Sequence, residues 1–344
     1  MIPTATLVKA ARTVSYALLA TLFLLIITLH LGPLLLAVLF GYFILDVLRF
    51  GNPRRKWLAV TLFVTLVTCA IYAFGFFIKE FLNSLPEIVD KGVPSVIRLA
   101  NDYGMELPFT DYESLRSFLM ETVKDQLRFL GVLARSATLE MVYLAVGLVA
   151  AISLFLHPRM ELDRPAAARP GNLYSLYCDE MGKRVAAFYR SFATVMGAQI
   201  AISAINTLLT AVFVLATGMP HPIIILGVTF LCGLLPVIGN LVSNTIITII
   251  GFTVSSQLAI SALLFLVAVH KLEYFLNSRI IGARIRNPVW LMLLGLLVGE
   301  RVMGLSGMIL APVVLYYLKV EIAKLRVGDD DDARTAPAPA PPAQ

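Results

Sequence analysis

Charged residues are scarce in this chain of 344 residues. Lys, Arg, Asp and Glu together make up 15% of the sequence, against 58% for the hydrophobic types. Soluble domains carry about 25% charged residues, so this composition excludes a large soluble core and indicates an integral membrane protein. The scarcity is greatest from Ser191 to His270, where eighty consecutive residues include none of the four charged types. A single membrane-crossing helix needs about 20 apolar residues, so this stretch must enter the bilayer several times.

The sequence is also poor in groups that carry enzyme chemistry. Its three cysteines are too widely spaced for a disulfide framework or a zinc site. It lacks the His-Glu-x-x-His motif of zinc proteases and the Gly-x-x-x-x-Gly-Lys loop that cradles nucleotide phosphates. The stretch Gly304-Leu305-Ser306-Gly307 has the form of a rhomboid protease motif. Such a protease needs a histidine on a later helix, and no histidine follows His270 in this sequence. We therefore expect no enzyme activity, no cofactor and no metal site.

Basic clusters beside the apolar runs indicate the topology. The net charge is +6, but the Lys and Arg residues lie in short loops next to the apolar runs, so nucleic acid is not an expected partner. Residues 1–78 predict three membrane helices, at 14–29, 33–48 and 57–78. The loop 49–56 between the second and third contains four basic residues and no acidic one. Because such loops stay on the cytoplasmic side, we expect both termini in the cytoplasm.

The remaining chain is expected to divide into five parts. Residues 79–138 keep helical spacing of apolar positions and predict a helical insertion outside the cytoplasm, and 139–157 predict a fourth membrane helix. Residues 158–190 predict a cytoplasmic loop and an amphipathic helix, and 191–326 a C-terminal core of further membrane segments. The acidic and Ala-Pro-rich tail 327–344 is expected to be disordered. The fold class is thus an all-α polytopic membrane protein with about eight membrane segments.

Two segments of the C-terminal core are interrupted, at residues 233–240 and 299–307. Proline and glycine fall where they harm a straight helix most. We expect each interrupted segment to be a re-entrant hairpin, the alternative being a full crossing. In a membrane, the freed backbone groups are tolerated only where protein or a wet cavity satisfies them. Paired broken segments of this kind indicate the binding site of a transporter.

Polar residues at and near these breaks are candidates for a transport path. Asn244 lies one helical turn beyond Asn240, so both amides can face one cavity. Gln199 and Asn206 are seven positions apart and can share a helix face, although such amides often only join helices. The candidates are Pro236, Gly239, Asn240, Asn244, Gln199, Asn206, Glu273, Arg279, Glu300 and Arg301.

Four of these candidates are charged. Glu300 and Arg301 fall in the second break, where a charge deep in the membrane costs roughly 2.5–3.5 kcal/mol and tends to be functional. Both would simply be hydrated if the hairpin tip reached the headgroups. Glu273 and Arg279 lie near the cytoplasmic end of a span, where a structural ion pair or a snorkelling arginine is the alternative to a gate.

The order of the motifs resembles the AI-2E family of bacterial transporters, named after exporters of autoinducer-2. The resemblance is carried by the break from Gly233 to Gly239, by Glu273 with Asn277-Ser278-Arg279, and by Gly304-Leu305-Ser306-Gly307 with Pro312 after it. It implies a multi-pass protein of the bacterial inner membrane that forms a homo-oligomer, a pentamer, and exports small solutes. Some relatives resemble sodium/proton antiporters.

Three functions are open on this basis. The leading hypothesis is a secondary transporter that exports a small organic solute, an autoinducer-2-like signal or another metabolite, through the broken-helix region. The alternative within transport is a cation/proton antiporter in which Glu273 or Glu300 carries the proton. From another class, the chain could be a membrane scaffold or regulator. A polar cavity at Asn240 and Asn244 would favour transport, and a dry, packed break would favour the scaffold.

Overall fold

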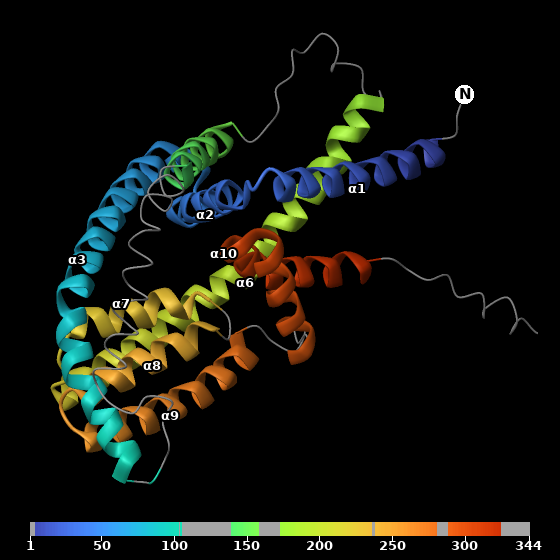
Figure 1. The fold of residues 1–344 in the computed structure, drawn as a ribbon. Helices are drawn as coiled ribbons and strands as arrows, with labels where there is room; N and C mark the ends of the chain where they lie inside the picture. Colours follow the sequence, from blue (N-terminus) through green and yellow to red (C-terminus); the bar gives the residue numbers. More distant parts are fainter. Residues whose placement is uncertain are drawn as a thin grey trace, which may run out of the picture.

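The computed structural model describes residues 4–102, 104, 139–157, 173–235, 238–280 and 288–324. These residues form helices joined by turns, and no strand occurs among them, in agreement with the all-α prediction. The elements, shown in Figure 1, are α1 (Thr4–Thr28), α2 (Gly32–Leu48), the short 3-10 helix η1 (Pro53–Arg55), α3 (Lys56–Asp102), an unlabelled helix Leu139–Leu156, α6 (Leu173–Thr217), α7 (Pro222–Gly233), α8 (Ile238–Phe252), α9 (Ser256–Ile280) and α10 (Val289–Ile322).

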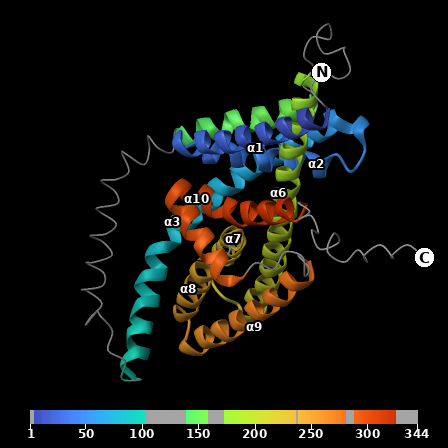
Figure 2. The same ribbon diagram turned by 90° about the vertical axis from the view of Figure 1, so that its right-hand side faces the viewer.

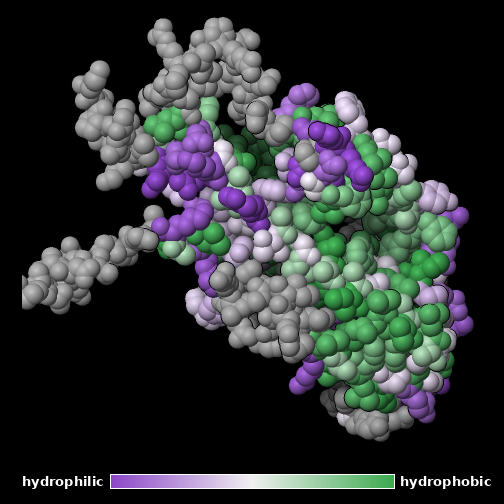
Figure 3. Space-filling model, turned by 180° about the vertical axis from the view of Figure 1, so that it is seen from behind, coloured by the Kyte–Doolittle hydropathy of each residue, from purple (hydrophilic) through white to green (hydrophobic). Residues whose placement is uncertain are grey.

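Six helices in the described ranges are long and apolar enough to cross a membrane. Their apolar windows are Ala10–Thr28, Lys56–Gly92, Leu139–Leu156, Leu176–Thr217, Ser256–Glu273 and Trp290–Ile322. Three shorter apolar helices, α2, α7 and α8, accompany them. Many large hydrophobic side chains are exposed, and Figure 3 shows them as a broad continuous area, with hydrophilic residues gathered mainly in one part of the surface. An apolar exterior of this extent is that of a multi-pass membrane protein.

The helices pack in two groups around three hydrophobic clusters. In Figures 1 and 2, α1, α2 and the helix Leu139–Leu156 lie at one end, and α7, α8 and α9 at the other. Phe192 and Met196 of α6 are buried with α1, α2 and α10 in the first group. In the second group, Ile224 of α7 and Ile247 of α8 are fully buried with residues of α3, α6 and α9. The long helices α3 and α6 run through both groups and connect them.

Two helices are longer than the sequence indicates. We expected a span at 57–78 followed by a separate short helix, but α3 continues without interruption to Asp102, with Pro86 and Pro94 inside it. Its continuation is held by tertiary packing, since Phe77, Phe81 and Ile88 contact the α7–α8 cluster. Likewise, the amphipathic helix predicted within 158–190 and the start of the membrane core predicted at 191–326 form the single helix α6. Most of the predicted insertion, residues 105–138, and the predicted tail 327–344 lie outside the described residues.

The break at 233–240 separates two helices too short to cross a bilayer. At 1.5 Å per residue, α7 and α8 are about 18 and 22 Å long, against about 30 Å for the hydrocarbon core. They fold back on each other, because Ile224 near the start of α7 packs in one cluster with Ile250 near the end of α8. Gly239 lies so close to the carbonyl group of Cys232 that no Cβ would fit there. The segment is therefore a tight helical hairpin.

Candidate functional site

The second predicted break also reverses the chain. Within α10, Met303 (φ −137°, ψ 15°) and Gly304 (φ 58°, ψ −139°) leave the helical conformation. Only glycine adopts the conformation of Gly304 readily, so this residue makes the turn. The two halves of α10 then lie against each other: a Cβ on Gly295 would stand 2.9 Å from Cδ1 of Leu315, and Gly299 faces the backbone of Gly307. Glycines at facing positions let the two backbones approach this closely.

Gln199 of α6 satisfies a backbone group at the first break. Its Nε2 donates to the carbonyl oxygen of Gly233 at 2.6 Å, at the end of α7, where helical carbonyls lack partners within the helix. One turn further along α6, the hydroxyl of Ser203 donates to the carbonyl oxygen of Phe230 at 2.7 Å. The amide of Gln199 thus fixes the hairpin on α6.

A half-enclosed polar pocket lies beside this hairpin, where α6, α7, α8 and α9 meet. Its central group is the carboxylate of Glu273 on α9, whose side chain is 14% exposed. Oε2 accepts from Nδ2 of Asn240 on α8 at 2.6 Å and from Nδ2 of Asn206 on α6 at 3.3 Å. Nδ1 of His270 lies 3.8 Å from the same oxygen. We call this site the Glu273 pocket, and it joins three helices through one carboxylate oxygen.

The lining of the Glu273 pocket is rich in oxygen atoms. It consists of Asn206, Thr210, Thr229, Asn240, Ser243, Asn244, Ile247, Leu266, Val269, His270 and Glu273. The cavity between them measures about 20 Å³, enough for one water molecule or one unhydrated cation. Asn206 and Thr210 are 5% and 1% exposed, and in the described part of the chain Oδ1 of Asn206 and Oγ1 of Thr210 have no hydrogen-bond partner. Unpaired buried oxygens at a cavity leave room for a further hydrogen-bond donor or a cation.

The side-chain amides of Asn206 and Asn240 can form hydrogen bonds with Glu273 in both of its protonation states. An ionised carboxylate accepts hydrogen bonds only, and the NH₂ groups of Asn206 and Asn240 donate to it. When the carboxyl group is protonated, its O–H becomes a donor, and either amide can present its carbonyl oxygen after turning by 180°. Either protonation state of the Glu273 carboxyl group can therefore be hydrogen-bonded by one of these amides.

The structure brings together four of the ten sequence candidates: Asn206, Asn240, Asn244 and Glu273 all line the pocket. Asn240 and Asn244, one helical turn apart on α8, both border this cavity. Gly239 is buried at the start of α8, while Glu300 and Arg301 are exposed on α10 and do not line the pocket. Pro236 and the side chain of Arg279 lie outside the described residues.

Sequence reasoning missed four polar residues of the pocket: Thr210, Thr229, Ser243 and His270. A signal for two of them was present in the helical spacing. Thr210 is four positions after Asn206 and Ser243 three positions after Asn240, so each pair shares a helix face. The meeting of the two faces at one carboxylate could be recognised only in three dimensions.

The fold and the Glu273 pocket define a helical multi-pass membrane protein with an ionisable polar site between its helices. A model of the family described as "AI-2E family transporter" matches residues 14–326, and the chain belongs to this family. It is also 24% identical over 169 residues to a protein of Bacillus subtilis (strain 168) described as "Putative transport protein YdbI". That match covers 48% of this chain and 48% of the relative, so the similarity extends over about half of each protein.

Proposed function

We propose that this protein is a secondary transporter in which Glu273 binds the coupling ion, a proton. The proposal rests on one observation: a nearly buried carboxylate, held by amides from two other helices, borders a polar cavity at a helix break. Charged groups within membrane segments tend to be functional, and carboxylates there commonly relay protons. The polar cavity at Asn240 and Asn244 favours transport over a packed scaffold.

The transported solute on this proposal is a small organic molecule exported across the bacterial inner membrane. The hairpins α7–α8 and α10 would be re-entrant, entering and leaving the membrane on one side. The basic loop 49–56 supports cytoplasmic termini. A homo-oligomer, a pentamer by resemblance to the family, belongs to the same proposal. On this proposal the coupling site does not include Glu300 and Arg301, because both are exposed on the surface of the α10 hairpin.

Cation/proton antiport is the second candidate, and the size of the pocket favours it. A cavity of about 20 Å³ holds a bare cation but no organic solute. One carboxylate with amide and hydroxyl oxygens is a ligand set that suits hard cations such as Na⁺. In this case Na⁺ and the proton would compete for Glu273.

The test uses the full chain and the variant Glu273→Gln, which keeps the shape of the side chain but cannot ionise. Glu300→Gln is the matched control, since Glu300 is exposed and outside the pocket. Proton movement is followed with a pH-sensitive dye in proteoliposomes on addition of Na⁺. In parallel, metabolites in the medium are compared between cells that carry each form.

We expect wild type and Glu300→Gln to behave alike and Glu273→Gln to lose the activity. Sodium-driven proton release would identify antiport, and a metabolite exported only by the forms with Glu273 would identify solute export. Equal activity of all three forms would contradict the role of Glu273. Complete inactivity of the wild type in both assays would favour the scaffold.

A further inference from the structure

A large apolar groove runs between α1 and α10, away from the Glu273 pocket. Its volume is about 810 Å³, and its lining is almost wholly apolar. Phe23 and Ile27 of α1 form part of one wall, and Val298 and Leu310 of α10 part of the other. Both helices contain candidate membrane spans. In a bilayer, the acyl chains of lipids are the apolar groups present at highest concentration along such helices.

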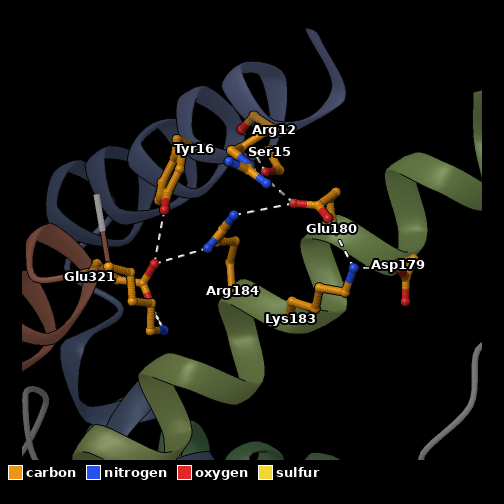
Figure 4. A network of polar contacts seen from close by, with 9 residues as sticks. Arg12, Ser15, Tyr16, Asp179, Glu180, Lys183, Arg184 and Glu321 are labelled. Carbon is orange, nitrogen blue, oxygen red and sulfur yellow. Dashed lines mark hydrogen bonds and ion pairs between the residues drawn. The ribbon is translucent and has the colours of Figure 1, made fainter. Parts of the chain in front are cut away.

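One end of the groove meets a cluster of charged residues, shown in Figure 4. Arg184 of α6 donates to Glu321 of α10 at 2.9 Å and to Glu180 at 3.2 Å. The hydroxyl of Tyr16, on α1, donates to Glu321 at 2.8 Å, and the guanidinium of Arg184 lies over the ring of Tyr16. The two carboxylate side chains are each 6% exposed. The basic side chains at the edge of the cluster are far more exposed, at 51% for Arg12, 57% for Lys183 and 53% for Lys324.

The accessible side chains of this cluster are thus Arg12, Lys183 and Lys324 against one carboxylate, Asp179, which is 63% exposed and pairs with Lys183 at 2.7 Å. Because Asp179 is taken up by Lys183, Arg12 and Lys324 leave the accessible surface basic on balance. The carboxylate of Glu321 is offset by Arg184 and Lys324, so it adds little negative field at the groove. Arg12 is the basic group with most freedom, because its ion pair with Glu180 is long, at 3.9 Å, and half of its side chain is exposed. It can turn toward an anion at the end of the groove without breaking a short hydrogen bond.

A buried hydroxyl at the same end has no partner. Tyr317 lines the groove and is 7% exposed, yet among the described residues its hydroxyl group makes no hydrogen bond. A buried polar group left unsatisfied is unfavourable. An ester or phosphate oxygen of a bound molecule would satisfy it. The end of the groove thus combines a spare donor with exposed positive charge.

We propose that the α1–α10 groove binds an anionic phospholipid. One acyl chain lies between the two helices, an ester or phosphate oxygen accepts from Tyr317, and the phosphate pairs with Arg12 and Lys324. The groove supplies the apolar length and the cluster supplies the charge, and neither feature takes part in the Glu273 pocket. The occupant is an anionic lipid because basic residues at a membrane surface attract anionic headgroups.

Native mass spectrometry of the full-length, delipidated protein tests the site. The protein is titrated with phosphatidylglycerol or with phosphatidylcholine of the same acyl chains, and bound lipids per subunit are counted. We expect the wild type to prefer phosphatidylglycerol by at least five-fold. Arg12→Gln should lower that preference about five-fold, the equivalent of about 1 kcal/mol. Arg54→Gln is the matched control, because Arg54 is exposed in η1 and remote from the groove in sequence.

A second pair of variants tests the apolar part. Ala20 lines the groove and is exposed, so Ala20→Trp should fill it and prevent binding of either lipid. Ala17→Trp, at an exposed position of the same helix outside the groove, should bind like the wild type. Equal binding by both tryptophan variants, or no preference of the wild type for phosphatidylglycerol, would overturn the proposal. So would a change of subunit number in Ala20→Trp with lipid binding intact, because a second copy would then cover the groove.

Cross-linking of the wild type makes the result independent of how the variants fold. A phosphatidylglycerol with a diazirine on its acyl chain is photoactivated on the purified protein, and the modified peptides are mapped. Labels on α1 and α10 are expected. Labelling confined to other helices would refute the site.

Discussion

Gly299→Ala tests the close approach of the two halves of α10. A Cβ at position 299 would lie well inside 3.0 Å of the carbonyl group of Gly307, a separation that real Cβ atoms essentially never show. The obstacle is backbone rather than the end of a flexible side chain, so the hairpin itself must open. Inserting a methyl group into a packed contact costs about 1–3 kcal/mol. We expect the free energy of unfolding to fall by that amount relative to a suitable alanine control.

Gly75→Ala provides that control. Gly75 lies in α3, and a Cβ there would meet no atom within 4 Å. Both substitutions gain the same helix propensity, about 1 kcal/mol. The difference between the free energies of unfolding of the two variants is therefore the cost of the steric clash at position 299. Unfolding is followed in mixed micelles with increasing sodium dodecyl sulfate, using the fluorescence of Trp290 at the start of α10 in a Trp57→Phe background. Equal unfolding midpoints for the two variants would refute the hairpin contact.

Two further substitutions test the charged groups. Arg184→Met removes the shared partner of the carboxylates of Glu180 and Glu321, which keep Lys183 and Lys324, and we expect the free energy of unfolding, measured in the same titration, to fall by about 1.5–3 kcal/mol. A loss under 1 kcal/mol would show that the cluster is not structural. Asn240→Asp places a second carboxylate beside Glu273 and should shift half-maximal transport to higher pH, because two adjacent carboxylates favour retention of a proton. An unchanged pH profile in proteoliposomes would contradict this, since His270, which among the described residues is the titratable neighbour of Glu273 at 3.8 Å, is unaltered.

The membrane segments and their breaks could be predicted because their signals are local. Apolar runs of sufficient length, basic loops, and the Pro and Gly residues at 233–240 and 299–307 are all readable along the chain. The helix Leu139–Leu156 and the hairpin of α7 and α8 were placed from these signals. The helix ends of α3 and α6 could not be placed, because packing against α7 and α8 extends α3 through Pro86, where local preference predicts an end.

The sequence by itself determined which segments are apolar enough to cross a membrane and where Pro and Gly residues interrupt them, since hydropathy and backbone preference belong to each segment alone. Only the tertiary structure decided what the polar residues do. Asn206 and Asn240 lie 67 and 33 positions from Glu273, and they meet at one carboxylate oxygen because α6, α8 and α9 pack side by side. Packing likewise separates Gln199, which caps α7, from Asn206 in the pocket. Contacts between helices depend on the faces that pack together, and no single segment specifies them.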